Sequence, residues 1–170
     1  AYTCSLLRGE AGGSEAWPDC DIVAQDLSRL IQQSDRQLAR LPESNNAPDV
    51  RDNALFAVCA WVDEALLLSS WPHKDQWHKQ SLQRTYFRTL NAGEEFFVRL
   101  HWLLGPLGPV GPLGQEELPH DEEHAPPRSD GLLEVFAMSL SLGFTGRYYH
   151  PGERHQLTGV KQAVREAMPQ

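Results

Sequence analysis

The sequence predicts an all-α protein with six or seven helices. Three observations lead to this fold class. Apolar residues recur at spacings of three and four in several long segments, stretches containing Gly and Pro separate those segments, and no segment of useful length alternates apolar and polar residues as a half-buried strand would. The length of 170 residues and the apolar content of 41% suit one domain with a real core, or one domain made of two small packed lobes.

The N-terminal part predicts a lead-in and one amphipathic helix. Residues 1–18 have few periodic apolar positions, so we expect a partly ordered lead-in, with the helical domain over 19–170. Asp19 or Asp21 can cap a helix over 22–41, which carries apolar residues on one face and polar ones on the other. The stretch LPESNNAPD then forms a loop, and its Pro48 suits a first helical turn.

The helix expected over 49–69 is apolar on nearly all sides. Such a helix is typical of a central position, packed on several faces. Asp63 and Glu64 are the charged residues in its interior, and Pro72 follows its end. We therefore expect the rest of the protein to assemble around this helix.

Four further helices and one long excursion complete the chain. We expect a helix over 76–89, packed through Trp77, Leu82, Tyr86 and Phe87, and a helix over 94–104, with Asn91-Ala92-Gly93 between them. Residues 105–130 form a long excursion whose Gly-Pro repeats forbid regular structure. Ser129 or Asp130 can cap a helix over 132–142, and a last helix runs over 153–168.

The composition excludes several functional classes. A formal net charge of −8 argues against nucleic-acid binding, because phosphate backbones are bound by basic patches, but it is compatible with a basic protein partner. No window approaches ~18 uninterrupted apolar residues, so no segment of this chain is expected to span a bilayer. The chain does not begin with Met and opens with no signal-peptide pattern, so we expect a fragment of a longer protein.

The three cysteines, Cys4, Cys20 and Cys59, are odd in number and form no CxxC pair. This usage indicates a reducing compartment, the cytosol. Cys59 lies in an apolar helical run, where we expect a buried free thiol.

Asp63 and Glu64 allow a catalytic and a structural interpretation. Neighbours on a helix point about 100° apart, so the two carboxylates do not converge on one substrate. Buried carboxylates can instead accept hydrogen bonds from indoles, from backbone N–H groups of a following turn, or from Arg on a neighbouring helix. The donors that we consider are Trp71, Trp77, Arg84 and Arg88. We favour the structural interpretation, in which the doublet fixes how the central helix meets the turn after it.

The sequence HDEEH, from His120 to His124, is a weak metal-site candidate. It lacks the HExxH order, and neighbouring prolines discourage the helix that would align the two imidazoles, so a solvated acidic loop is the simpler interpretation. GxSxG, GxxxxGK[ST] and GxGxxG do not occur, and the prolines of GPLGPVGPLG remove the N–H donors that a phosphate cradle needs. We expect no cofactor and no catalytic site.

The stretch GFTGRYY, residues 143–149, predicts a structured corner between two helices. Gly143 suits a helix C-cap with positive φ, and Gly146 permits a second tight turn. Phe144 can enter the core, and Arg147 can pair with a carboxylate such as Asp63 or Glu64.

Four motifs in this order resemble the cytoplasmic domain of the TssL/DotU family of bacterial type VI secretion systems, which has relatives in type IVb systems. The motifs are CAWVDEALLLSSW, W-x-x-Q-S-L from Trp77, NAGEEFFVRL from Asn91, and LSLGFTGRYY from Leu140, followed by a closing Leu/Val helix. The similarity covers about residues 20–168. The family positions carried by this chain are Asp63, Glu64, Trp71, Trp77, Gly93, Glu94, Phe96, Phe97, Gly143, Phe144, Gly146, Arg147 and Tyr148.

The resemblance implies a non-enzymatic structural and docking subunit. Its domain would consist of two small helical bundles that form a hook with a cleft, facing the cytoplasm and followed by one C-terminal transmembrane helix in the inner membrane. Its partners would be TssM and TssJ in the membrane complex and TssK in the baseplate, and a homodimer is also compatible with it. We treat the motif residues chiefly as fold-defining, with a contribution to a docking surface as a hypothesis.

Two departures and two rival functions accompany this assignment. The excursion over 105–130 is longer than the usual family connection, and the chain ends at Gln170 without an anchor. The rivals are a small helical enzyme that uses Asp63 and Glu64, and a metal-responsive regulator that uses His120 and His124.

Overall fold

The computed structural model describes residues 17–40, 48–105 and 129–168, and the described part is helical, without a strand. The α-helices are α2 (Cys20–Leu38), α3 (Pro48–Leu68), α4 (Lys74–Trp77), α5 (Leu82–Phe87), α6 (Ala92–Leu104), α7 (Asp130–Ser141) and α8 (Arg154–Ala167), with 3₁₀ turns at Gly146–Tyr148 and Pro151–Glu153. The all-α prediction is confirmed. Residues 1–16 of the expected lead-in and 106–128 of the expected excursion lie outside the described residues.

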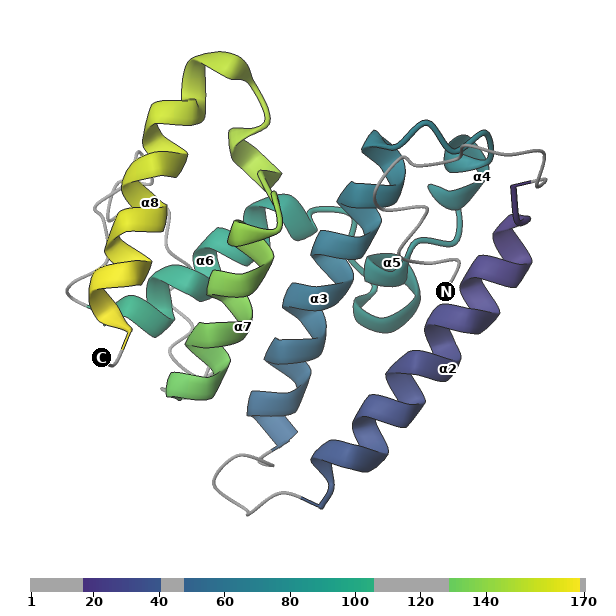
Figure 1. Ribbon diagram of the computed structural model, residues 1–170, viewed down its shortest axis with the longest axis horizontal. Helices are drawn as coiled ribbons and strands as arrows, with labels where there is room; N and C mark the ends of the chain where they lie inside the picture. Colours follow the sequence, from purple (N-terminus) through teal and green to yellow (C-terminus); the bar gives the residue numbers. More distant parts are fainter. Residues whose placement is uncertain (1–16, 41–47, 106–128, 169–170) are drawn as a thin grey trace.

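The helix α3 occupies the centre of the molecule, as its apolar sequence predicts. It packs against α6 and α7 on one side and against α2, α4 and α5 on the other (Figure 1). It begins at Pro48, which lacks the N–H that a first helical turn leaves unbonded. No described helix combines the length and apolar character that a membrane crossing requires.

Two clusters of buried side chains lie on the two sides of α3. One joins α3 to α6, α7, α8 and the turn Gly146–Tyr148, and the other joins α3 to α2, α4 and α5. Trp61 and Phe87 are partly buried and pack against both clusters. The two cores therefore share one helix and are not separated by a linker.

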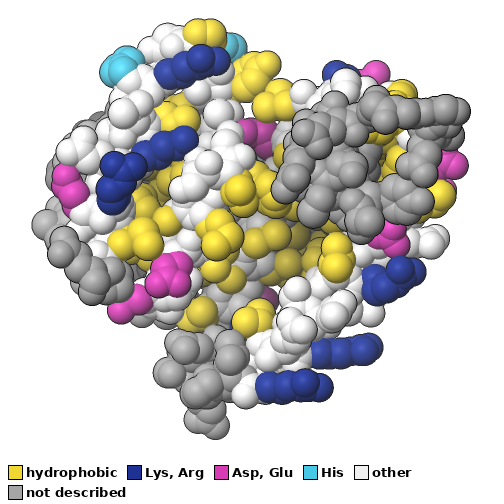
Figure 2. Space-filling view, in the orientation of Figure 1, with side chains coloured by type: hydrophobic (Ala, Val, Ile, Leu, Met, Phe, Trp, Pro, Cys, Tyr) yellow, Lys and Arg dark blue, Asp and Glu magenta, His cyan; other side chains and the backbone are white. Residues whose placement is uncertain are grey.

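One face of α3 remains open to solvent, contrary to the expected burial on nearly all sides. Val58 and Leu68 are 40% and 52% exposed, and Met138 and Leu142 at the C-terminal part of α7 are also exposed. Figure 2 shows apolar side chains gathered across the middle of one face of the molecule.

The prediction of a single helix over 76–89 is wrong. The chain forms α4 and α5 with a break at residues 78–81. The break occurs because the amide groups of Leu82 and Gln83 donate to the carboxylate of Asp63 on α3 and not to carbonyls one turn earlier. Tyr86, expected to pack inside, is 37% exposed.

The remaining helix ends follow local chemistry. Ser129 caps α7, since its hydroxyl accepts from the Leu132 amide at 3.4 Å. Gly143 follows the end of α7 with φ of +105°, the left-handed conformation that glycine adopts easily, as predicted. The helix α6 begins at Ala92, two residues before the predicted start, because the Gln83 side chain accepts the Ala92 amide at 3.1 Å.

Candidate functional site

Asp63 is fully buried on α3, and its carboxylate accepts three hydrogen bonds. The Trp77 indole Nε1 donates to Oδ1 at 2.9 Å, as does the Leu82 amide at 2.9 Å, and the Gln83 amide donates to Oδ2 at 2.8 Å. Ser81, the N-cap residue of α5, makes no side-chain capping bond. Asp63 therefore caps α5 from a different helix.

Burial raises the pKa of Asp63, and the hydrogen bonds from Gln83, Leu82 and Trp77 act in the opposite direction. All of its described donors are internal, and its side chain has no exposed surface. A dissolved substrate would have no access to this carboxylate.

Glu64 binds a different segment. The amide and hydroxyl of Thr145 donate to Oε1 at 2.7 and 2.9 Å, and the Gly146 amide donates to Oε2 at 2.7 Å. These donors belong to the corner after α7, more than 80 residues along the chain. Glu64 therefore ties the central helix to that corner, while Asp63 ties it to α5.

Several side chains that the sequence suggested as donors to Asp63 and Glu64 bind other groups. The Trp71 indole donates to the Pro18 carbonyl at 3.0 Å. Arg147 pairs with Glu94 at 3.0 Å and not with the doublet. Within the described ranges, Arg84 and Arg88 form no bond with Asp63 or Glu64. Of the donors that the sequence suggested, only the Trp77 indole and backbone amide groups bind these carboxylates.

Gly93 and Gly146 allow α6 to pass close to the corner. Gly146 has φ of +49°, and a Cβ atom there would lie 2.7 Å from the Gly93 carbonyl oxygen and 2.9 Å from the Phe97 ring. A Cβ atom on Gly93 would lie 3.3 Å from the Gly146 Cα. Gly146 therefore requires the absence of a side chain, whereas a Cβ on Gly93 would be a tight contact that the corner backbone must shift slightly to accommodate.

Aromatic rings fill the space beneath this contact. The Phe96 ring lies 4.3 Å from Phe144 and 4.6 Å from Phe136 between centroids, and Phe97 lies 4.7 Å from Tyr148. The rings meet in tilted and edge-to-face arrangements, which favour aromatic pairing. The motif aromatics of α6 and of the corner thus form one part of the core.

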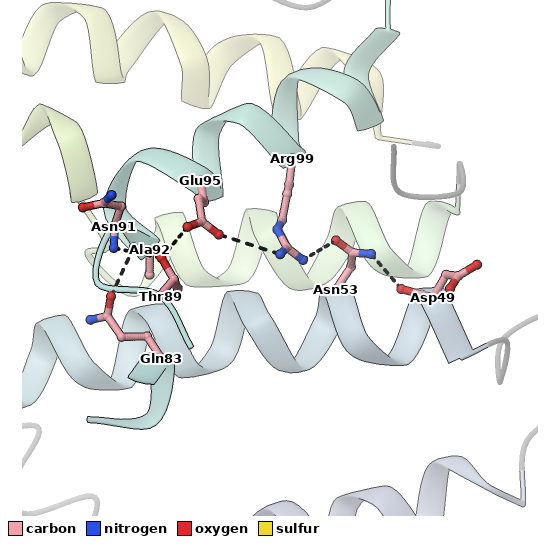
Figure 3. A network of polar contacts seen from close by, with 8 residues as sticks. All are labelled: Asp49, Asn53, Gln83, Thr89, Asn91, Ala92, Glu95 and Arg99. Carbon is pink, nitrogen blue, oxygen red and sulfur yellow. Dashed lines mark hydrogen bonds and ion pairs between the residues drawn. The ribbon is translucent and has the colours of Figure 1, made fainter. Parts of the chain in front are cut away.

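A polar network runs along α6 and joins it to α3 through Arg99 and Asn53 (Figure 3). Arg99 donates to the Asn53 side chain at 2.8 Å, lies 3.9 Å from Glu95, and its guanidinium carbon lies 3.8 Å from the centre of the Phe56 ring. Glu95 also accepts from the Thr89 hydroxyl. The sequence motifs did not predict this network, although one signal was present: Arg99 falls on the same helical face as Phe96 and Leu103, where a charge needs a partner.

A surface hollow lies where these segments meet. Its volume is about 260 Å³, and its lining comes from the C-terminal half of α3, from Gln83 and Leu90, from the start of α6 and from the corner after α7. Leu68, Leu90 and Tyr149 are 52%, 60% and 56% exposed. We call this hollow the α3 groove; it is lined by Ala60, Glu64, Leu67, Leu68, Gln83, Leu90, Ala92, Gly93, Phe144, Gly146 and Tyr149.

Four motif residues, Glu64, Gly93, Phe144 and Gly146, are brought together in the α3 groove. No sequence pattern indicates Leu90 as a site residue, because its place beside residues of the distant corner depends on the tertiary fold. Trp71 and Trp77 do not line the groove. They lie in the buried cluster that joins α3 to α2, α4 and α5, and their ring centroids are 6.1 Å apart.

The cysteine and histidine candidates have separate outcomes. Cys59 is a buried free thiol, and burial raises its pKa to about 12. Cys20 is also buried, and its thiol donates to the His73 carbonyl at 3.2 Å. His120, His124 and Cys4 lie outside the described residues; within the described ones, no three His, Cys, Asp or Glu side chains form a group suited to a metal ion.

Comparison with known proteins agrees with the motifs. The sequence model of the family "Type VI secretion system protein DotU" matches residues 7–107, more than half of the chain. The fold is similar to the crystal structure of the type VI secretion protein SciP/TssL from enteroaggregative Escherichia coli 042, with a TM-score of 0.66 and 25% identity over 98% of this chain and 81% of that one. No curated protein matches the sequence. The chain therefore belongs to the DotU family of type VI secretion system proteins.

Proposed function

We propose that this protein is a non-enzymatic structural subunit that links the inner membrane to the baseplate of a type VI secretion system. Its cytoplasmic domain would dock baseplate components, TssK first among them. The α3 groove is the docking surface in this proposal. The two clusters on either side of α3 would form the arms of a hook, with the groove as part of its cleft.

The observation that carries this proposal is the composition of the α3 groove. Family motif residues line it, and three large side chains at its edge, Leu68, Leu90 and Tyr149, are more than half exposed. Exposed apolar groups beside a hollow are typical of sites where another protein binds.

The acidic doublet supports the same proposal by fixing the walls of the groove. Asp63 holds Gln83, which contacts the start of α6, and Glu64 holds Thr145 and Gly146. A surface that is rigid before binding loses less conformational entropy when a partner docks. The buried motif residues would therefore serve docking indirectly, through the shape of the groove.

We propose that the domain faces the cytoplasm, anchored at the inner membrane with TssM and TssJ. Its net charge of −8 favours a partner with a basic surface, and this attraction weakens as salt rises. The affinity for TssK should therefore fall between low and high salt. An affinity that does not change with salt would contradict the electrostatic part of the proposal.

A matched pair of variants tests the docking surface. Leu90→Ser removes an exposed apolar side chain at the groove, and Leu30→Ser removes one from α2, which contributes no residue to the groove. We expect Leu90→Ser to weaken TssK binding at least about tenfold, as central interface residues do, with no loss for Leu30→Ser. Equal binding by both variants would place the docking surface elsewhere. Circular dichroism would verify that both remain folded.

A further inference from the structure

We propose that the α3 groove receives one long cationic side chain, Arg or Lys, from the docked partner. This inference rests on the proposed docking function and specifies the chemistry of the residue that enters the groove. It follows from the charge of Glu64, from the helix ends around the groove, and from the size and lining of the hollow.

The carboxylate of Glu64 is held by neutral donors alone among the described residues. Its three described donors are two backbone amides and one hydroxyl, all neutral, and it forms no ion pair within the described ranges. The cation nearest in sequence to its donors, Arg147, is paired with Glu94 at 3.0 Å. A carboxylate at the edge of a hollow with neutral donors only is suited to an incoming cation.

The helix ends around the groove add to this preference. Helix C-termini carry partial negative charge, and the last turns of α3 and α7 contain no basic residue. Leu67 and Leu68 of the α3 end line the groove, and α7 leads into Phe144. Lys74 reaches the Ser69 carbonyl beyond the α3 end at 3.5 Å but forms no ion pair with Glu64 in the described structure.

The positive helix ends at the groove already have anionic partners. The first amides of α5 donate to Asp63, and the first turn of α6 contains Glu94 and Glu95. The positive ends are therefore matched by carboxylates. At the negative ends, Lys74 reaches the Ser69 carbonyl just beyond α3, but the last turn of α7 contains no basic residue. This imbalance favours a cationic ligand over a neutral or anionic one.

The dimensions and walls fit a side chain. A volume of about 260 Å³ is below the roughly 300–1,000 Å³ typical of small-molecule sites. Leu67, Leu68 and Leu90 offer apolar contact for the methylene stem of Arg or Lys, whose charged head would reach Glu64. The exposed ring of Tyr149 can face the same cation.

A charge-reversal pair at one exposed position tests the inference with the partner TssK. Leu90→Glu and Leu90→Lys remove the same apolar contact and differ in the sign of the new charge. We expect Leu90→Glu to bind TssK at least about fivefold more tightly than Leu90→Lys at low salt, because opposite charges attract across the groove. Equal losses for the two variants, or tighter binding by Leu90→Lys, would overturn the inference.

A second experiment needs no partner protein. The probes are N-acetyl-arginine amide and its neutral isostere N-acetyl-citrulline amide, titrated at millimolar concentrations against the ¹⁵N-labelled protein. We expect the arginine probe to shift the Thr145 and Gly146 amide resonances and the citrulline probe to leave them unchanged, with a weaker effect in Leu90→Lys. Identical responses to both probes, or no response to arginine, would overturn the inference.

The two experiments separate the two proposals. Failure of the wild-type protein to bind TssK would contradict the docking function. The arginine titration would then be the sole test of whether the groove binds a cationic side chain. Binding of TssK without charge discrimination at Leu90 would contradict the cationic side chain while leaving the docking function in place.

Discussion

Replacement of Asp63 tests how far one buried carboxylate holds α5 in place. Asp63→Ala leaves the Trp77 indole and the Leu82 and Gln83 amides without their acceptor. Each buried donor without a partner costs about 1–3 kcal/mol, and removal of a desolvated carboxylate offsets part of this. We expect a net loss of about 3–5 kcal/mol, which is large against a typical folding free energy of about 5–15 kcal/mol.

Asp63→Asn should have an intermediate effect. Its remaining oxygen can keep the bonds from Trp77 and Leu82, while its amide nitrogen would face the Gln83 N–H, donor against donor. We expect a loss of about 1–2 kcal/mol. The order of stability should therefore be wild type, then Asp63→Asn, then Asp63→Ala.

Urea denaturation followed by far-ultraviolet circular dichroism and Trp fluorescence measures these losses. An unchanged slope with a lower midpoint would show that stability alone has changed. Asp52→Ala and Asp52→Asn are matched controls on an exposed position of α3, where we expect changes within about 0.5 kcal/mol. If the Asp63 variants lose no more than these controls, the capping role assigned to Asp63 is wrong.

The pH dependence gives a second readout for the same residue. Burial raises the pKa of Asp63 above its ordinary value of 3.8, so the folded protein takes up this proton more readily than the unfolded chain. Wild-type stability relative to Asp63→Asn should therefore increase as pH falls through the raised pKa toward 3.8, and decrease as pH rises through it. Urea midpoints of both proteins across this window would show the trend.

Three other predictions concern single side chains. Gly146→Ala should lower stability by about 2–3 kcal/mol in urea denaturation, because a Cβ would meet the Gly93 carbonyl at 2.7 Å, whereas Gly152→Ala, with no neighbour within 4 Å, should be near neutral. Gly159→Ala inside α8 should raise stability by about 0.5–1 kcal/mol, seen as a higher Tm. Burial raises the pKa of Cys59 from 9.0 to about 12, so the wild type should lose roughly 1 kcal/mol relative to Cys59→Ala on reaching pH 10, where only the unfolded thiol ionises; urea midpoints of both proteins at pH 8 and 10 would measure this.

The helices and much of the core could be predicted from the sequence because their information is local. The apolar spacing of α3, α6, α7 and α8 repeats within each segment, and Gly143 and Gly146 indicate turns by residue type alone. The break between α4 and α5 could not be predicted, because its acceptor, Asp63, lies 19 residues before Leu82. No local pattern records a bond of that range.

The candidate site was predictable in part for the same reason. Trp77 follows Asp63 closely enough in sequence to be considered as a donor, and it is one. The sequence makes Arg147 one candidate partner of the doublet, but its partner is Glu94 at the start of α6, because α6 runs beside the corner. The edge of the groove at Leu90 and Tyr149 joins segments far apart in sequence, so only the folded structure reveals it.

The sharing of α3 by both cores has a consequence for how this protein can be dissected. Neither half of the chain can retain its apolar interior without α3, and Trp61 and Phe87 would lose contacts if either side were removed. Truncation at the boundary between the cores would therefore yield an aggregation-prone fragment and not an independently folded domain. Denaturation should likewise proceed as one concerted transition, with no stable half-folded species along the way.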